Sequence, residues 1–284
     1  MITGARRIKD LIRNQAAGDS GKAQMLLRHF AMERFLERLS VSRYRDDFII
    51  KGGILISSLV GVGERMTRDI DATMRGHDMT LNNISRILGE VAAIDIGDGF
   101  SFELGEPQEI MEDSEYGGVR IPVRASIEKT QTAFKVDIST GDAITPDAIE
   151  YNYALMFEGR SIPLRSYNTE TALAEKIETI LSLALQTTRM RDFYDIHALL
   201  SSGFDIDYAL VGRALDATTT TRQSAASLAD SEKVIALFKV SDMMADHWKR
   251  YQRANSFAEG IGWQEVLSSL SEVLGRVMGA RNEQ

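Results

Sequence analysis

Apolar residues recur every three or four positions in several segments of the first half of the chain, the spacing of a helix that buries one face. This spacing predicts helices over residues 5–16, 22–39, 54–62 and 80–93. Other segments alternate apolar and polar residues and contain β-branched side chains, a pattern typical of strands. They predict strands over residues 48–51, 69–74, 100–110, 117–127 and 132–140. The first half is therefore predicted to be α+β, a mixed sheet edged by helices.

The pattern changes near residue 165, because apolar residues then keep a helical spacing with few β-branched runs. Helices are predicted over residues 169–187, 189–201, 206–217, 222–255 and 263–279. Pro163 and the polar sequence "SYNT" that follows it mark the change. We therefore expect an α+β domain over residues 1–165 and a helical domain over residues 166–284.

The composition is ordinary for a soluble globular protein, with 284 residues, 44% of them hydrophobic and 26% charged. No apolar run approaches the ~18–20 residues of a membrane-spanning helix, and the basic N-terminus is not followed by a secretory signal. The absence of cysteine excludes disulfides and thiolate metal sites. We therefore expect a cytoplasmic protein that does not bind membranes.

The net charge of −8 is distributed unevenly along the chain. Residues 1–51 contain 11 basic and 6 acidic side chains, whereas the remainder is strongly acidic. The acidic bulk argues against broad non-specific binding of nucleic acid, but the basic segment could face a partner that carries phosphate. Two solvated helices with arginines at their edges would give the same balance, so charge alone leaves both interpretations open.

Two acidic residues, Asp69 and Asp71, flank Ile70 in the predicted strand "DIDATM". Residues i and i+2 of a strand project to one face, so these carboxylates are expected to lie side by side. Asp137, on the polar face of the strand "TAFKVDIST", is a candidate third member. Such carboxylates repel unless a cation joins them, and three of them could hold two Mg²⁺ ions and a triphosphate. The alternative is an acidic pair that faces solvent on an edge strand.

A glycine pair, Gly52 and Gly53, stands between a predicted strand and a predicted helix. Without side chains there, the backbone can approach a ligand, and the amides at the start of the helix point toward a phosphate. Ser57, one turn further on, could face the same phosphate or lie on the helix surface. A tight turn explains the glycines equally well. The Walker pattern G-x-x-x-x-G-K-[ST] is absent, which excludes a P-loop.

The sequence "FIIKGGILISSL" followed by "ERMTRDIDATM" resembles the signature of polymerase-β-like nucleotidyltransferases: a hydrophobic strand, a glycine turn and a D-x-D strand. The form R-x-[ST]-x-D-[ILV]-D, met as Arg65, Thr67, Asp69 and Asp71, resembles that of the AbiEii/MenT toxin family. A later block, "ALAEKIETILSLALQTTRMRDFYDIHALL", is similar to that family's K-[IL]…R-x-[KR]-D-x-x-D-[IL]. The resemblance implies an N-terminal polymerase-β-like nucleotidyltransferase domain and a C-terminal helical domain.

The resemblance also implies roles for individual residues. The residues expected to be catalytic are Asp69, Asp71, Lys176 and Asp192. The expected metal ligands are Asp69, Asp71 and Asp137. Lys176 would neutralise a β- or γ-phosphate, and Asp192 would orient or deprotonate the attacking hydroxyl, with Asp195 as the alternative acid. Contacts to the nucleotide are expected from Lys51, Gly52, Gly53, Ser57, Arg65, Thr67, Lys176, Arg189 and Arg191, with Arg68 as a further candidate.

The function implied by the resemblance is that of a Mg²⁺-dependent nucleotidyltransferase toxin of a toxin–antitoxin or phage-defence system. It would use two Mg²⁺ ions to transfer NMP from an NTP to a nucleic-acid hydroxyl, at the 3′ acceptor end of tRNA, and so inhibit translation. An antitoxin encoded alongside is the expected protein partner. Because Ile54 replaces the Ser or Thr often found after the glycine pair, the chain could instead be a regulator that binds GTP or ATP without transferring it. It could also modify a small molecule.

Overall fold

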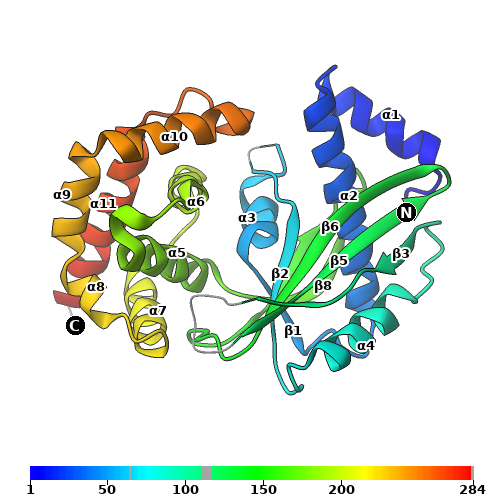
Figure 1. Ribbon diagram of the computed structural model, residues 1–284, viewed down its shortest axis with the longest axis horizontal. Coiled ribbons are helices and arrows are strands. Elements are labelled where there is room, and N and C mark those ends of the chain that lie inside the picture. Colours follow the sequence, from blue (N-terminus) through cyan, green and yellow to red (C-terminus); the bar gives the residue numbers. More distant parts are fainter. Residues whose placement is uncertain (64, 111–116, 283–284) are drawn as a thin grey trace. The chain divides into compact units, whose positions relative to one another are not determined.

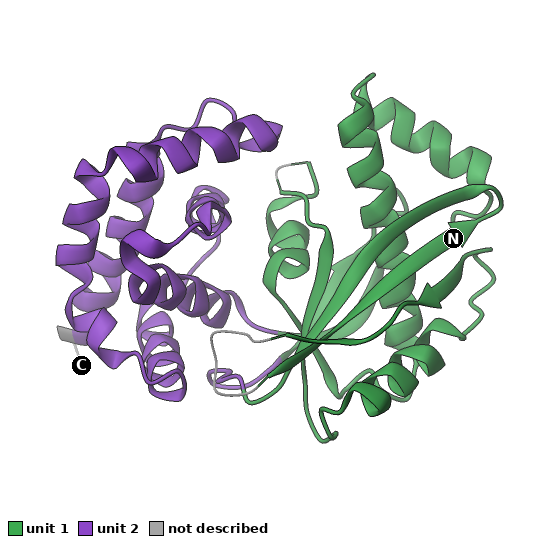
Figure 2. Cartoon of the chain, viewed as in Figure 1, with its two compact units in different colours: residues 1–141, 149–166 green, residues 142–148, 167–284 purple. Residues whose placement is uncertain are grey.

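The computed structural model describes residues 1–63, 65–110 and 117–282. The chain forms two compact units (Figure 2), which are Met1–Gly141 with Ile149–Ser166 (unit 1) and Asp142–Ala148 with Tyr167–Gln284 (unit 2). Unit 1 is a mixed sheet with helices and unit 2 is helical, so the predicted α+β class is confirmed. The segment 142–148 packs with unit 2 although two strands of unit 1 follow it in the sequence.

The sheet of unit 1 has the strand order β3-β5-β6-β2-β1-β8-β7, with β4 paired to β5 (Figure 1). Its strands are β1 (Phe48–Lys51), β2 (Asp69–Met74), β3 (Ser101–Leu104), β4 (Gln108–Ile110), β5 (Gly118–Ile127), β6 (Thr130–Ser139), β7 (Ile149–Ala154) and β8 (Ser161–Ser166). The β1–β8 and β2–β6 pairs are parallel and the others are antiparallel. Strands β2 and β1 therefore lie inside the sheet, where Ile50 and Ile70 are buried.

The helices of unit 1 are α1 (Ala5–Ala16), α2 (Ser20–Val41), α3 (Gly52–Val60) and α4 (Leu81–Ala92). Helix α2 begins after Asp19, whose carboxylate accepts the Lys22 N–H at 3.0 Å, a typical N-cap. Helix α2 contacts β6 and β8, and α4 contacts β3 and β5 (Figure 1). Phe35 of α2 packs edge-on against Phe134 of β6, with ring centroids 5.8 Å apart. The face of β6 that carries Phe134 is therefore the face that α2 covers.

Helix α2 also carries charged side chains into the interior of unit 1. Arg38 is 1% exposed and Asp98 is fully buried, and the guanidinium donates to both carboxylate oxygens at 2.7 and 2.8 Å. The same guanidinium donates to the Phe100 carbonyl at 3.0 Å. One turn earlier, Arg34 pairs with Glu158 at 2.9 Å. Because buried charges are tolerated only when paired, these bonds fix α2 to the segment after α4 and to the β7–β8 turn.

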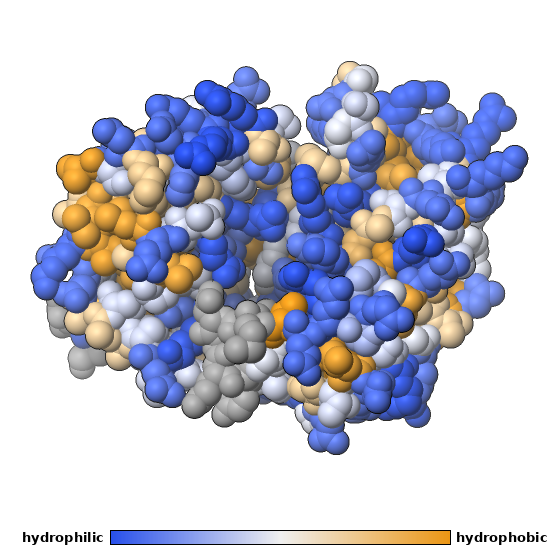
Figure 3. All heavy atoms as spheres, in the orientation of Figure 1, coloured by the Kyte–Doolittle hydropathy of each residue, from blue (hydrophilic) through white to orange (hydrophobic). Residues whose placement is uncertain are grey.

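Unit 2 consists of helices with an aromatic core. They are α5 (Thr169–Leu183), η1 (Ala184–Gln186), α6 (Met190–Ser201), α7 (Tyr208–Thr221), α8 (Ala225–Ala229), α9 (Ser231–Val240), α10 (Asp242–Ala254), η2 (Ser256–Ala258) and α11 (Trp263–Asn282). Phe193 of α6 packs against Phe238 and Trp263 with centroids 5.4 and 5.1 Å away. Leu237 and Val240 give α9 a hydrophobic outer surface (Figure 3). Within the described residues, none of the helices has the length and apolar character needed to cross a membrane.

Two segments differ from the elements predicted from the sequence. The prediction contains no strand at β7 or β8, and it uses Pro163 only to mark the change near residue 165. In the structure Pro163 pairs with Asn152 of β7, whereas β8 pairs with β1 only at Arg165 and Ser166, so the proline breaks no bond to β1. The helix expected over residues 222–255 is divided into α8, α9 and α10 by short polar segments.

We predict that Asp98→Ala lowers the free energy of unfolding by about 3–5 kcal/mol, because the buried Arg38 guanidinium loses its carboxylate partner. Urea unfolding at pH 7, followed by circular dichroism, measures the change. Asp10→Ala is the matched control, since Asp10 pairs with Arg13 on the surface and its loss should cost less than about 1 kcal/mol. Equal effects of the two substitutions would contradict the importance given to the buried pair.

Candidate functional site

Ionisable side chains from four neighbouring strands of unit 1 lie in register. Lys51 of β1 pairs with Asp71 of β2. Asp71 in turn pairs with Asp137 of β6, and Asp137 with Arg120 of β5. In-register residues of adjacent strands project to the same face, so a cation, two carboxylates and a second cation follow one another across the sheet. Asp69 adds a third carboxylate two residues before Asp71. We call these five residues the charged row.

Repulsion among the carboxylates of the charged row acts on Asp71. Burial raises the pKa of the Asp71 carboxyl above its ordinary value, and the charges of Asp137 and Asp69 raise it further. The Gly53 N–H, which donates to Asp71 Oδ2 at 3.2 Å, and the Lys51 ammonium act in the opposite direction. These two groups therefore offset only part of the effect that burial and the neighbouring carboxylates have on the pKa of Asp71. Carboxylate oxygens such as those of Asp69 and Asp71 are the kind of ligand that a hard divalent cation takes.

Within the charged row, the Asp137 carboxylate forms an ion pair with Arg120. Arg120 Nε donates to Asp137 Oδ1 at 2.8 Å, and Nη2 donates to Oδ2 at 2.5 Å. These hydrogen bonds raise the pKa of the Arg120 guanidinium, against the effect of its partial burial. In the part of the chain that the structure describes, no three acidic or histidine side chains are arranged to hold a metal ion together. Asp69 and Asp71 are the two carboxylates of the row that do not accept these hydrogen bonds from Arg120.

The glycine turn before α3 packs directly against the charged row. Gly52 has a φ of +61°, in the left-handed region that favours glycine. A Cβ built at Gly52 would overlap the Asp71 carboxylate and lie 2.8 Å from the Asp71 Cβ. A Cβ at Gly53 would lie 2.6 Å from Thr67 Oγ1 and 2.9 Å from Arg65 Nη2. Side chains are therefore excluded at both positions. Because the glycines have none, the backbone lies close enough for the Gly53 N–H to donate to Asp71.

Three of the predicted nucleotide contacts lie inside unit 1. Ser57, Arg65 and Thr67 are each at most 1% exposed. The Ser57 hydroxyl donates to the Arg65 carbonyl at 2.5 Å, and the Arg65 guanidinium donates to the Met66 carbonyl at 2.9 Å. Together with their packing against Gly53, these bonds fix the segment before β2 and the glycine turn. In the structure, the three side chains therefore pack beneath the glycine turn and stabilise its conformation.

Two arginines lie near the Asp69 end of the row. Arg28 of α2 donates from Nε to the Ala133 carbonyl of β6 at 2.8 Å. Burial lowers the pKa of Arg28, the charge of Arg68 lowers it further, and the charge of Asp69 raises it. Arg68 is exposed. The sequence does not single out Arg28, since α2 and β2 are far apart along the chain and only the folded sheet brings them together.

The second predicted block lies in unit 2, where Lys176 joins α5 to α6. Its ammonium is 2.8 Å from Asp192 Oδ1 and 2.7 Å from Asp195 Oδ2. Arg189 Nε donates to the other oxygen of Asp192 at 2.9 Å. Asp195 is fully buried, and the side chains of Asp192 and Lys176 are 6% and 11% exposed. The structure brings these four residues together, while Arg191 lies exposed at the start of α6.

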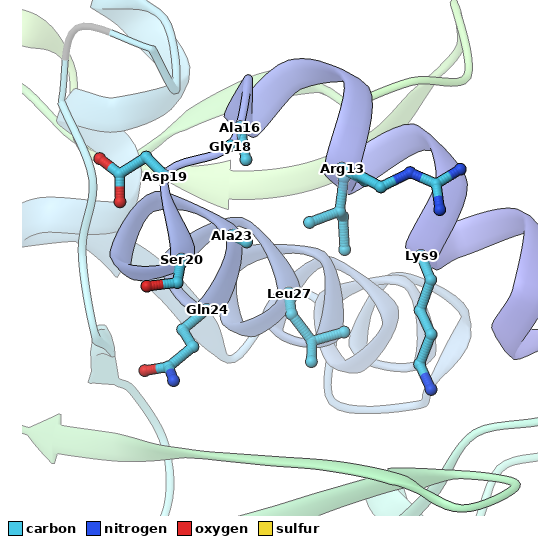
Figure 4. A pocket seen from close by; sticks show the side chains of 10 residues that line it. Lys9, Arg13, Ala16, Gly18, Asp19, Ser20, Ala23, Gln24 and Leu27 are labelled. Atoms are coloured by element: carbon cyan, nitrogen blue, oxygen red, sulfur yellow. The ribbon is translucent and has the colours of Figure 1, made fainter.

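A cavity of about 320 Å³ lies between α1 and α2 in unit 1. Ile12 and Ala16 of α1 and Leu27 of α2 give it an apolar lining, and Lys9 and Arg13 add basic side chains (Figure 4). No residue of the charged row lines this cavity. It is therefore a separate feature of the basic N-terminal segment.

Comparison with known proteins identifies the family. The family model described as "Nucleotidyl transferase AbiEii toxin, Type IV TA system" matches residues 34–269. No curated protein sequence matches the chain significantly. The solved structure of MenT4, a nucleotidyltransferase toxin from Mycobacterium tuberculosis H37Rv, is similar with a TM-score of 0.57 and 17% identity, covering 94% of this chain and 98% of that chain. JHP933 from Helicobacter pylori gives a TM-score of 0.52 and 18% identity, covering 92% of this chain and 94% of that chain.

At these identities the two structures establish a shared fold. The family model covers most of the chain, and the matched residues contain the charged row, the glycine turn and the Lys176 cluster. The chain belongs to the AbiEii nucleotidyl transferase toxin family of type IV toxin–antitoxin systems.

Proposed function

We propose that this chain is a Mg²⁺-dependent nucleotidyltransferase toxin that transfers NMP from an NTP to the 3′ acceptor end of tRNA. Loss of translation would then arrest growth, as part of phage defence. The observation that carries the proposal is the charged row, with Asp69 and Asp71 on one strand face beside a turn from which side chains are excluded. Membership of the family supports the nucleotidyltransferase chemistry and an antitoxin partner.

Asp69 and Asp71 are the residues that would hold the divalent cation. Carboxylate oxygens are the ligands that Mg²⁺ prefers in proteins. The raised pKa of Asp71 supports this choice, because burial and neighbouring carboxylates leave its negative charge insufficiently balanced. When bound, Mg²⁺ would stabilise the charge that develops on the transferring phosphoryl group.

The residues around this carboxylate pair are suited to the NTP. The glycine turn lets the start of α3 approach a triphosphate closely, and the N-terminus of a helix favours negative charge. Lys51 offsets part of the charge of Asp71. Arg28 and Arg68 provide positive charge near Asp69, which suits phosphates of the NTP or of the acceptor strand.

The proposal also assigns roles to Lys176 and Asp192 of unit 2. The proposal gives Lys176 the neutralisation of a β- or γ-phosphate and gives Asp192 the orientation or deprotonation of the attacking hydroxyl. Two observations support the fixed positions that these roles need. Lys176 and Arg189 hold both oxygens of Asp192, which fixes the orientation of the carboxylate. The buried Asp195 holds the ammonium of Lys176 at 2.7 Å and so positions it.

The transfer reaction is tested by incubating the purified protein with each α-³²P-labelled NTP, Mg²⁺ and total tRNA. We expect labelled RNA with at least one NTP, and a loss of about 10²–10³-fold in Asp69→Asn, because a ligand of the cation that stabilises the transition state is removed. The control is Asp78→Asn, since Asp78 is an exposed acid of the same unit, and this variant should keep full activity.

Other products would support other functions. Bound nucleotide without label on any RNA would contradict transfer and favour a nucleotide-binding regulator. A labelled product of low mass, formed without RNA, would favour a small-molecule nucleotidyltransferase. In cells, wild type should arrest growth and Asp69→Asn should not, so normal growth with well-expressed wild type would argue against a toxin.

The exclusion of side chains at the glycine turn gives a second prediction. Gly52→Ala should lower kcat/KM for the NTP at least tenfold, about 1.4 kcal/mol, because the new Cβ displaces the Asp71 carboxylate. Gly76 is the matched control, with a φ of +76° and no atom within 4 Å of an added Cβ. Gly76→Ala imposes a similar backbone cost, about 1–2 kcal/mol, without touching the row. Equal losses of activity in the two variants would refute this role.

The raised pKa of Asp71 predicts how stability depends on pH. A carboxyl whose folded pKa is raised penalises the folded state above that pKa, and the penalty disappears below the unfolded value of ~3.9. Asp71→Asn should therefore increase the free energy of unfolding at pH 7 in EDTA, and the gain should vanish near pH 3. Urea unfolding at both pH values measures it, with Asp78→Asn as control. A variant less stable than wild type at pH 7 would contradict the electrostatic account.

A further inference from the structure

The Arg120–Asp137 pair removes one carboxylate from the set available to a metal. The guanidinium takes both oxygens of Asp137, at 2.8 and 2.5 Å, in the two-bond geometry that a planar fork makes with a carboxylate. The Asp137 side chain is 8% exposed and that of Arg120 is 33% exposed. The carboxylate is therefore enclosed, and its accessible side is occupied by the arginine.

The sheet fixes this pair in place. Strands β5 and β6 pair over nine successive positions, from Val119 and Ile138 to the turn at Ile127 and Thr130, and Arg120 and Asp137 are direct cross-strand partners. Val119 and Ile121, on either side of Arg120, are buried in the core. Removing the guanidinium from Asp137 would leave an enclosed carboxylate without its cation, which is strongly unfavourable.

The positions of the cations along the row are also informative. Asp137 has Arg120 on one side and Asp71 on the other, while Asp71 has Lys51 on its far side. Arg120 forms a direct bidentate bond with both oxygens of Asp137, so the carboxylates of the row that are left for a divalent ion are those of Asp71 and Asp69. One divalent ion could be held by these two residues. A second ion ligated by Asp137 would have to displace a permanently charged guanidinium.

We propose that Arg120 takes the place of a second divalent ion: it holds Asp137 permanently, and the nucleotide-free protein binds a single ion through Asp69 and Asp71. This inference rests on the proposed function, because it concerns the cation of the same site. It makes Asp137 a residue that positions the row through Arg120. The expectation of two ions with Asp137 as the third ligand is replaced by one ion and a guanidinium.

The experiment is a titration of the nucleotide-free protein with Mn²⁺, measured by isothermal calorimetry and by the electron paramagnetic resonance signal of free Mn²⁺. Wild type should bind one ion per chain. The double variant Asp137→Asn/Arg120→Gln, which removes the ion pair as a whole, should change the dissociation constant by less than about threefold, whereas Asp69→Asn should raise it at least tenfold. Arg120→Gln should bind Mn²⁺ at least tenfold more tightly or bind a second ion, because it releases the Asp137 carboxylate and removes a competing charge.

Arg124→Gln is the matched control for Arg120. Arg124 lies on the same face of the same strand, but its partner is Glu103, 3.6 Å away and exposed. Its substitution should leave both the number of ions and their affinity unchanged. Circular dichroism checks that every variant is folded, and the number of ions bound by wild type tests the inference even if one variant is not.

The outcomes separate this inference from the proposed function. Two ions per wild-type chain, or a tenfold loss of affinity in the double variant Asp137→Asn/Arg120→Gln, would overturn the role of Arg120 and leave the nucleotidyltransferase proposal intact. An Arg120→Gln variant that binds Mn²⁺ like wild type would also overturn it. If wild type shows no saturable binding, or if Asp69→Asn binds as wild type does, the cation site itself is refuted and both proposals fail.

Discussion

The site in unit 1 depends on a repulsion that the sheet itself creates. The parallel pairing of β2 with β6 places Asp71 beside Asp137, and the alternation of β2 adds Asp69 on the same face. Two unit charges ~5 Å apart repel by about 3 kcal/mol at an effective dielectric constant of ~20, so this register is tolerable only with positive charge nearby. Lys51 and Arg120 supply it from the strands on either side. In the proposed function, Mg²⁺ at Asp69 and Asp71 supplies the rest.

The repulsion among the carboxylates also explains the structure around the charged row. Carboxylates that must stay together need a rigid frame, and the glycine turn provides one because Gly53 packs against Arg65 and Thr67. Unit 2 also contains a pair of neighbouring acids with a cation between them, since Asp192 and Asp195 both form ion pairs with the ammonium of Lys176. In each unit, a cation of the protein holds at least one of these acids: Arg120 holds Asp137 in unit 1, and Lys176 holds Asp192 and Asp195 in unit 2.

The sequence predicts the parts of this site that depend on local spacing. The i, i+2 pair of β2 and the glycine turn are visible because strand alternation and backbone freedom act over a few residues. The pairing of Arg120 with Asp137 is not visible, because it depends on the register of β5 against β6, which the residue pattern leaves undetermined. Ser57 was expected near a phosphate, but the face of α3 that carries it is turned inward, and its hydroxyl bonds the Arg65 carbonyl. The helix over residues 5–16 was predicted well from its apolar periodicity, whereas the long helix predicted over residues 222–255 is divided into three. The strands were predicted least well where pairing partners are distant, as at β8.

The most direct measurement of the central claim is anomalous diffraction from crystals grown with Mn²⁺ and a non-hydrolysable NTP. The account predicts a Mn²⁺ peak at ~2.0–2.3 Å from carboxylate oxygens of both Asp69 and Asp71, with the triphosphate against the glycine turn. A bound nucleotide without a peak at these two residues, or a peak held by other side chains, would contradict it.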